Sequence, residues 1–591
     1  NNREGIKMFG EIEYINDNVA HIKVKEGTPI NEDLMNMHVI FEDDKKKILG
    51  EVEDITKEMI KIRFLGEIVN GKFVGGVIRK PNLSSEIRVI TKDEFKLIVG
   101  EDNASSMMLG VSPLYDDCPI YVNVNDLFSN HMAIFGNTGS GKSWGLARLL
   151  QNVFENKNIV PFRSNFLIFD AYGEYHTAFR EIDKINPNFN FKYFTTNIND
   201  TEGSLLSMPI FLFNVDDLAL FLNATSHSQL PIIEKMLKIV RIFAEDSNMS
   251  EDYKNHLIAK AIMNILYTNQ TSTSKRNDIF SILNDCSTEK FNLEAPVQGL
   301  GYTRKFRDCF IIDKEGNFTE SILVTDYVSS FINPDLDQYE SRTNNYYNLK
   351  DLEKALDFTL ISEGMLKNER TYSDAISLKV KLHSIIIGEN AKYFDYPNYI
   401  DLNNYIASLV TCKNGHKAQI INFNLEDIED SMAKVITKVY TRMLFDFTKK
   451  LPDRASIPFH LFLEEAHRYV QNDNDKILLG YNIFDRVAKE GRKYGLIFNL
   501  ISQRPVEISE TVISQCSNFI IFKMNHPRDL EYIKKMLPNI NQEIIEKQKS
   551  LQPGTCVAFG KAFKIPLIIK MTPPNPEPYS SNCDVENRWK A

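Results

Sequence analysis

One short pattern constrains this chain more than any other feature: residues 136–143 read Gly-Asn-Thr-Gly-Ser-Gly-Lys-Ser, a complete phosphate-binding loop. An apolar run, Met132–Phe135, precedes the loop, and a helix-favouring stretch begins at Trp144. Glycines let such a loop curl so that backbone N–H groups point at phosphate oxygens, and the helix that follows adds partial positive charge. Lys142 can then reach the β- and γ-phosphates while the Ser143 hydroxyl ligates Mg²⁺. The loop therefore predicts a site for ATP or GTP with magnesium.

The predicted nucleotide-binding residues are the whole loop and the residue after it. They are Gly136, Asn137, Thr138, Gly139, Ser140, Gly141, Lys142, Ser143 and Trp144. A chance match in a glycine-rich loop is the alternative. The apolar run before the loop and the helical stretch after it argue against chance, because a phosphate loop joins a strand to a helix.

Composition limits the class of protein. Of 591 residues, 43% are hydrophobic and 25% charged, and no run of about 18 apolar residues is present, which predicts a soluble protein without a membrane segment. No secretory signal is seen at the start, and the seven scattered cysteines form no Cys-x-x-Cys pair. These features favour the cytoplasm and no structural zinc. The net charge of −10 excludes coating of nucleic acid through overall charge but leaves room for a local basic channel.

The pattern of apolar residues changes along the chain. Alternating segments with turns about every ten residues predict an antiparallel β-barrel first. Strands alternating with helices then predict an α/β core, as in the apolar run Asn165–Asp170, and a helical stretch interrupts this core, for example at Leu230–Phe243. The predicted domains are the barrel (1–103), the first part of the core (104–211), a helical insertion (212–400), the second part of the core (401–572) and an extended proline-rich tail (573–591).

Two groups of carboxylates follow predicted core strands. Glu464 suits water-mediated holding of Mg²⁺, and Glu465 is the candidate catalytic base because an attacking water needs orienting just beyond a strand end. Two solvated glutamates at the start of a helix are the alternative. Asp170 and Glu174 follow another strand and could serve the same site, since ligands bind at the carboxyl ends of parallel strands. A turn stabilised by Asp170 and Gly173 explains that spacing equally well.

An amide and an arginine complete the candidate catalytic set. Gln503 follows an apolar strand and could hydrogen-bond the γ-phosphate or the attacking water, although a turn or helix cap accounts for it as well. A basic cluster at 485–494 could supply an arginine to a neighbouring subunit's nucleotide, because guanidinium stays charged and offers forked donors. Arg492 is the first choice and Arg486 the second. A solvated helix is the alternative for this cluster.

Five segments, in this order, resemble the HerA family of hexameric ATPases, relatives of FtsK-type DNA pumps. They are GNTGSGKS (136–143), DAYGEY (170–175), LEEAHRYV (463–470), AKEGRKYG (488–495) and SQRP (502–505). A barrel followed by a RecA-like core split by helices resembles that family too. The resemblance implies nucleotide and Mg²⁺ roles for Lys142, Ser143, Glu464 and Glu465, a sensor role for Gln503, and a finger role for Arg492 across the subunit boundary. The family commonly has arginine where Lys489 stands, so no role is transferred to that residue.

The same resemblance implies a function. We expect a homo-hexameric ring that hydrolyses ATP at subunit interfaces and draws double-stranded DNA through its central channel. Such a motor would drive or activate an effector protein, either a nuclease or a sirtuin-like NAD-consuming enzyme, in antiphage defence or DNA-end processing. A nucleotide-stabilised hexameric scaffold with little translocation is the alternative. A DEAH-type helicase fits less well, because it needs two RecA-like domains and only one phosphate loop is present.

Overall fold

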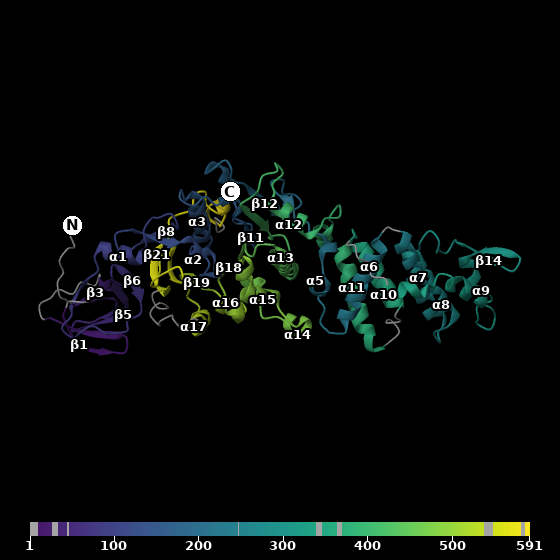
Figure 1. The fold of residues 1–591 in the computed structure, drawn as a ribbon, viewed down its shortest axis with the longest axis horizontal. Coiled ribbons are helices and arrows are strands. Elements are labelled where there is room, and N and C mark those ends of the chain that lie inside the picture. The colour runs from purple at the N-terminus through teal and green to yellow at the C-terminus, as the bar shows by residue number, and fades with distance from the viewer. Residues whose placement is uncertain are drawn as a thin grey trace.

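The structure is a computed structural model that describes residues 10–25, 34–43, 46–245, 248–338, 345–362, 369–536, 548–580 and 585–590. Figure 1 shows an elongated molecule with three regions along its long axis. An N-terminal sheet lies at one end, a large sheet with its helices occupies the middle, and a helical region forms the other end.

The N-terminal region is an antiparallel sheet of seven strands in the order β1-β2-β5-β4-β3-β7, with β6 beside β5. The strands are β1 (Gly10–Asn16), β2 (Val19–Val24), β3 (His38–Asp43), β4 (Lys46–Ile55), β5 (Met59–Val69), β6 (Lys72–Gly75) and β7 (Glu86–Val89). Alternate residues of β5, such as Ile60 and Ile62, are buried, as the sequence pattern predicts. The predicted antiparallel β unit is confirmed as a half-barrel sheet: among the described strands, edge strands β1 and β7 do not pair with each other. Strand β7 is four residues long and leads almost directly into helix α1 (Lys92–Val99).

A 12-stranded sheet forms the middle of the molecule, in the order β13-β12-β16-β11-β17-β18-β10-β19-β20-β21-β8-β9. Strands β13 to β19 of this order are mutually parallel, and the remaining four continue antiparallel. The bounds are β8 (Ser106–Ser112), β9 (Cys118–Asn123), β10 (Met132–Phe135), β11 (Phe166–Asp170), β12 (Phe191–Thr195), β13 (Ser204–Leu205), β16 (Ile420–Asn424), β17 (Phe459–Leu463), β18 (Leu496–Ser502), β19 (Asn518–Phe522), β20 (Thr555–Gly560) and β21 (Leu567–Lys570). The predicted α/β core is confirmed.

The parallel strands are covered by helices on both faces. Neighbouring residues of β10 point to opposite sides: Phe135 joins the hydrophobic cluster that includes α13 (Asp430–Lys450) and α15 (Ile483–Glu490), and Ile134 joins the cluster that includes α3 (Lys142–Glu155). Burial on both sides explains why these strands are nearly continuous apolar runs. Shorter helices in this region are α2 (Val124–Phe128), α4 (His176–Phe179), α14 (Asp475–Leu479), α16 (Glu510–Ser514) and α17 (Pro527–Met536).

A mainly helical segment lies between β13 and β16 in the chain. Its elements are α5 (Val215–Phe221), α6 (Gln229–Ala244), α7 (Asn248–Leu266), α8 (Ser272–Cys286), β14 (Pro296–Gly299), β15 (Tyr302–Lys305), α9 (Ser321–Ser329), α10 (Leu349–Ser362), α11 (Glu369–Ile387) and α12 (Leu402–Val410). Helix α6 confirms the helix predicted over Leu230–Phe243. The hairpin β14–β15 lies toward the end of the molecule farthest from the N-terminal sheet (Figure 1). The domain limits at 103, 211, 400 and 572 stay predictions.

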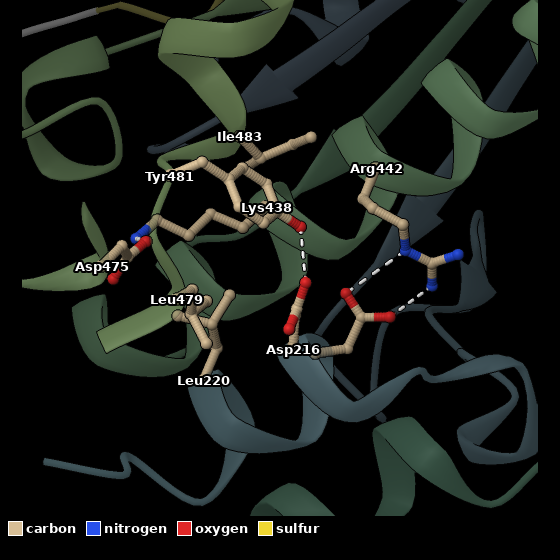
Figure 2. A pocket seen from close by; sticks show the side chains of 9 residues that line it. Asp216, Leu220, Lys438, Arg442, Asp475, Leu479, Tyr481 and Ile483 are labelled. Carbon is tan, nitrogen blue, oxygen red and sulfur yellow. Dashed lines mark hydrogen bonds and ion pairs between the residues drawn. The ribbon is translucent and has the colours of Figure 1, made fainter. Parts of the chain in front are cut away.

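Buried charges join this helical segment to the central sheet (Figure 2). Arg442 of α13 donates hydrogen bonds to Asp217 of α5, and both side chains are nearly inaccessible to solvent. Beside them, the Tyr481 hydroxyl donates to Asp216 at 2.7 Å. Lys438, one helical turn before Arg442, pairs with carboxylates in and just before α14. The helices are therefore docked on the core by specific polar contacts as well as by apolar packing.

The end of the chain returns to the central sheet. Gln151 of α3 accepts a hydrogen bond from Asn575 N at 2.9 Å and donates one to Pro576 O at 2.8 Å. Tyr579 N donates to Glu174 O at 2.8 Å, so residues 575–579 of the predicted tail are attached to the core. Helix α19 (Val585–Lys590) follows, with an exposed Trp589. No helix in the described residues has both the length and the apolar character that a membrane span requires.

Candidate nucleotide-binding site

The phosphate loop joins β10 to α3, as the sequence predicts. Gly139 and Gly141 have φ angles of 73° and 101°, which side chains rarely adopt. A Cβ atom on Gly141 would also lie 2.8 Å from the backbone nitrogen of Gly554. That nitrogen donates a hydrogen bond to Ser140 O at 3.0 Å, so the residue before β20 supports the loop from behind. The loop has the tight curl that a phosphate cradle needs.

Lys142 is a buried cation at the centre of the site. Its Nζ donates to Asn137 O at 3.2 Å, within the loop itself. Burial lowers the pKa of Lys142, and the nearby carboxylates Glu465, Glu464 and Glu174 act against that shift. Three glutamates, which follow two different strands, therefore lie near the loop lysine. The structure brings these predicted residues together.

Glu464 and Asp170 lie at the ends of the adjacent parallel strands β17 and β11. Glu464 accepts a hydrogen bond from Ala171 N at 3.1 Å, and burial together with the charges of Asp170 and Glu174 raises its pKa well above the ordinary value. Asp170 is fully buried and accepts from Glu174 N at 3.0 Å and from Tyr175 N at 2.9 Å. Its carboxylate thus orders the turn that carries Glu174, so in this structure Asp170 shapes the site through that turn.

Glu174 faces the first turn of α3. Burial raises the pKa of its carboxyl group, and a hydrogen bond from the Ser143 hydroxyl opposes the shift. Glu174 Oε2 is buried without a hydrogen-bond partner. A buried, unpaired carboxylate oxygen beside a serine hydroxyl and Glu464 fits a divalent cation, which takes oxygen ligands. No three His, Cys, Asp or Glu side chains in the described part of the chain gather as a complete metal site, so phosphate and water oxygens would supply the other ligands.

Glu465 has an unusual backbone conformation. Its φ of 46° and ψ of 50° are left-handed, an arrangement that costs free energy for a residue with a side chain and that clusters at functional sites. Only 7% of its side chain is exposed, and its Oε2 lies 3.2 Å from His467 Nδ1 without a well-directed hydrogen bond. The carboxylate is close enough to Lys142 to oppose the lowering of the pKa of that lysine.

Gln503 lies directly next to the phosphate loop. It follows β18, which pairs with β10, and its Oε1 accepts a hydrogen bond from the Thr138 hydroxyl at 2.6 Å. An amide in contact with the loop is placed to respond to a bound γ-phosphate. Trp144, in the first turn of α3, has 37% of its surface exposed.

The candidate arginines do not belong to this group of residues. Arg492 is exposed in a 3-10 turn (Gly491–Tyr494) before β18, whereas Gln503 follows β18. The seven residues of β18 place these ends about 20 Å apart. Arg492 Nη1 donates to Asn130 Oδ1 at 2.9 Å, and Arg486 faces the rings of Phe445 and Tyr481. Neither arginine contacts the phosphate loop of its own chain.

Several residues of the site were missed by the sequence reasoning. His467 and Ser502 lie in the motifs at 463–470 and 502–505, and a histidine two residues after a candidate base is the signal that could have found the first of them. Asn130, which holds Arg492, and Gly554, which supports the loop, carry no local signal. Both are distant in sequence from the residues they contact, so only the fold reveals them.

A protein-family model described as "Helicase HerA, central domain" matches residues 108–298, which include the phosphate loop and the turn at 170–175. "DNA double-strand break repair helicase HerA" from Saccharolobus solfataricus is 24% identical over 572 residues, covering 96% of this chain and 87% of the relative. This chain is an ATPase that is similar in sequence to HerA helicases over nearly its whole length. The protein of the same name from Sulfolobus acidocaldarius is 22% identical over 585 residues, covering 98% of the HerA-like chain and 91% of the relative.

Solved structures also resemble the HerA-like chain. VirB4 of Thermoanaerobacter pseudethanolicus has a TM-score of 0.44 and 13% identity, covering 80% of this chain and 98% of that chain. The bacterial conjugative coupling protein TrwB has a TM-score of 0.42 and 12% identity, covering 83% and 94% of the two chains.

Proposed function

We propose that this HerA-like ATPase forms a homo-hexameric ring that translocates double-stranded DNA and hydrolyses ATP at the boundaries between subunits. The observation that carries the proposal is the separation of the catalytic groups. The phosphate loop, Glu465 and Gln503 gather at the carboxyl edge of the parallel strands, whereas Arg492 is exposed at the opposite edge. A ring of identical subunits joins unlike faces, so it can bring the arginine of one subunit to the site of the next.

ATP fits the site through the loop and Lys142. The backbone N–H groups of the loop and the N-terminus of α3 would hold the phosphates, and Lys142 would turn from Asn137 O toward the β- and γ-phosphates. Ser143, Glu464 and Glu174 would hold Mg²⁺, directly or through water, and the ion would neutralise charge on the phosphate oxygens. Asp170 keeps the turn in place.

Hydrolysis needs a base and a positioned water. Glu465 would accept the proton of the attacking water, because its carboxylate is buried beside Lys142 and not engaged in a well-directed hydrogen bond. Gln503 would hydrogen-bond that water or the γ-phosphate and transmit its loss to the loop through Thr138. Arg492 of the adjoining subunit would stabilise the charge that spreads in the transition state. Loss of the phosphate would break that contact and shift one subunit against the next.

DNA and an effector are the proposed partners. The names of the HerA relatives concern repair of DNA double-strand breaks, which supports duplex DNA as the substrate of movement. Basic loops facing the channel would grip phosphates without reading sequence. The family resemblance supports a nuclease or a sirtuin-like NAD-consuming enzyme as the effector, acting in the cytoplasm in antiphage defence or DNA-end processing.

The test is ATP hydrolysis with and without duplex DNA. We expect strong stimulation by DNA. Lys142→Ala should weaken ATP binding by a factor of about 100, because it removes a charged contact to phosphate. Glu465→Gln should keep binding but lower kcat by about 10² to 10⁴-fold, since it removes the base. Glu315→Gln, an exposed glutamate of the helical segment, is the matched control and should leave both quantities unchanged.

Two results would contradict the proposal. Undiminished hydrolysis by Glu465→Gln would remove Glu465 from the role of base. Hydrolysis that does not respond to duplex DNA, in a ring that assembles normally, would favour the nucleotide-stabilised scaffold over the motor.

A further inference from the structure

The imidazole of His467 contacts residues at the ends of two neighbouring strands of this site, β17 and β18. His467 lies in a 3-10 turn (Ala466–Arg468) directly after Glu465, and 15% of its side chain is exposed. Its Nδ1 lies 3.2 Å from Glu465 Oε2 and 3.1 Å from Ser502 Oγ. Glu465 follows β17 and Ser502 ends β18, so the ring contacts the ends of two neighbouring parallel strands.

The chemistry of these two neighbours decides which ring nitrogen carries hydrogen. A carboxylate oxygen only accepts hydrogen bonds, so a bare nitrogen lone pair 3.2 Å from Glu465 Oε2 would repel it. Ser502 Oγ already accepts from Arg504 N at 3.0 Å, but its own hydroxyl hydrogen can rotate elsewhere. Nδ1 therefore carries the hydrogen and is the donor of the pair. One hydrogen faces two acceptors and can be directed well at only one of them at a time; in this structure it is directed at Ser502, because Glu465 Oε2 has no hydrogen-bond partner.

Ser502 connects this competition to the phosphate loop. It immediately precedes Gln503, whose Oε1 accepts from Thr138 at 2.6 Å. A movement of Gln503 toward a bound phosphate would displace the adjacent Ser502, and a displaced Ser502 would change the share of the His467 hydrogen that Glu465 receives. The backbone of Glu465 is already held in the left-handed region, so a small change of contact can reorient its carboxylate.

We infer that His467 is a positioning residue for Glu465: through Nδ1 it sets the orientation of the carboxylate and couples that orientation to the Gln503 strand by way of Ser502. The inference rests on the proposed function of Glu465 as the base. His467 takes part in no proton transfer and acts only through the orientation of the carboxylate beside it.

The chain offers a geometric test at position 467. In His467→Asn, the amide nitrogen takes nearly the place of Nδ1, whereas in His467→Gln the amide nitrogen takes nearly the place of Nε2. His467→Leu removes both ring nitrogens and keeps an apolar body. We expect kcat for ATP hydrolysis to fall about 10- to 100-fold in the Leu and Gln variants and to recover substantially in the Asn variant. KM for ATP, affinity for a non-hydrolysable ATP analogue and Tm should stay near the wild-type values in all three.

Two outcomes overturn the inference. If Asn and Gln are equally impaired, or if kcat falls together with nucleotide affinity and Tm, His467 is only a structural residue of the turn. In addition, Ser502→Ala should change kcat in the wild-type background but not in the His467→Leu background. Independent, multiplying effects of these two substitutions would refute the link to the Gln503 strand.

Glu465→Gln separates this inference from the proposed function. If Glu465→Gln hydrolyses ATP normally, the assignment of the base fails and the inference fails with it. If Glu465→Gln is inactive while His467→Leu retains the wild-type kcat, only the positioning role of His467 is wrong.

Discussion

Among individual side chains, His460 is held neutral by its surroundings. It lies in β17, four residues before Glu464, and its Nε2 donates to Phe128 O at 2.9 Å because a carbonyl oxygen can only accept. Burial lowers the pKa of His460 to about 4, against an ordinary value of 6.5, and the hydrogen bond only partly opposes this. Protonating this imidazole would place a positive charge inside the central sheet, away from water, which costs free energy.

This shift predicts a loss of stability in acid. A pKa that is lower in the folded state stabilises the fold above the unfolded value, and that stability is lost progressively as the pH falls from the unfolded value of 6.5 toward the folded value of about 4. The wild-type protein should lose about 2 kcal/mol from His460 between pH 7 and pH 5. His460→Gln keeps a donor near Nε2 without a titrating group, so its Tm should fall less over that range. The same substitution at exposed His227 should not change the pH dependence, and an equal effect of both would contradict the explanation.

A buried ion pair also connects helix α13 to helix α5. Arg442 on α13 and Asp217 on α5 form a pair with 10% and 3% of their side chains exposed, and Asp217 also caps α5 by accepting from Asn214 N at 3.0 Å. A buried carboxylate that loses its cation is expensive, whereas an exposed pair contributes little. Removing either side chain would leave the other one buried without its partner. The docking of the helical segment on the core therefore depends on both residues.

Arg442→Ala should destabilise the protein by about 3–5 kcal/mol, because it leaves Asp217 buried and unpaired. Pairing Arg442→Met with Asp217→Asn should recover most of that loss, since the amide keeps the cap without the charge. Thermal unfolding of both variants measures the difference. Arg307→Ala, which breaks the exposed pair with Glu294, is the control and should leave the free energy of unfolding nearly unchanged. Equal losses at Arg442 and Arg307 would contradict this account.

Helices and strands of the core were predictable, because the period of their apolar residues reflects burial directly. The runs at 132–135, 165–170 and 518–523 match β10, β11 and β19, and the amphipathic stretch at 230–243 matches α6. The antiparallel half-barrel sheet was predictable in kind but not in closure, because alternation reveals that a strand has one buried face but not whether the two edges of a sheet meet. Ring closure depends on strand length and bending, which alternation does not encode.

Across the whole molecule, the opposite placement of the site and Arg492 predicts cooperation between subunits. In co-assembled particles, an Arg492→Ala subunit still offers Glu465, and a Glu465→Gln subunit still offers Arg492. If the proposed ring joins them at random, about one boundary in four combines the two intact groups. Two variants that are nearly inactive alone should therefore recover about a quarter of wild-type hydrolysis when co-expressed in equal amounts. Measuring ATP turnover of the co-assembled particles tests this.

The control replaces Arg492→Ala by Arg486→Ala, the second candidate. Two results together would support Arg492 as the residue that reaches the neighbouring subunit's site. ATP hydrolysis should recover when Arg492→Ala and Glu465→Gln subunits are mixed, and Arg486→Ala alone should keep full activity. No recovery in a mixed particle of normal size would mean that the arginine acts within its own chain or not at all.

The sequence alone determined the phosphate loop, the strands around it and the carboxylates and amide at the strand ends. These features are local: glycine at turns, apolar runs for buried strands, and polar residues where strands stop. The tertiary structure alone decided which of them meet. In the folded chain, Glu465 and two further glutamates lie near Lys142, and Gln503 accepts a hydrogen bond from Thr138. Gly554 contacts the phosphate loop, and Arg492 lies at the opposite edge of the sheet. Such contacts join residues up to several hundred positions apart, and they follow from the order in which strands pair, which depends on the packing of the whole sheet.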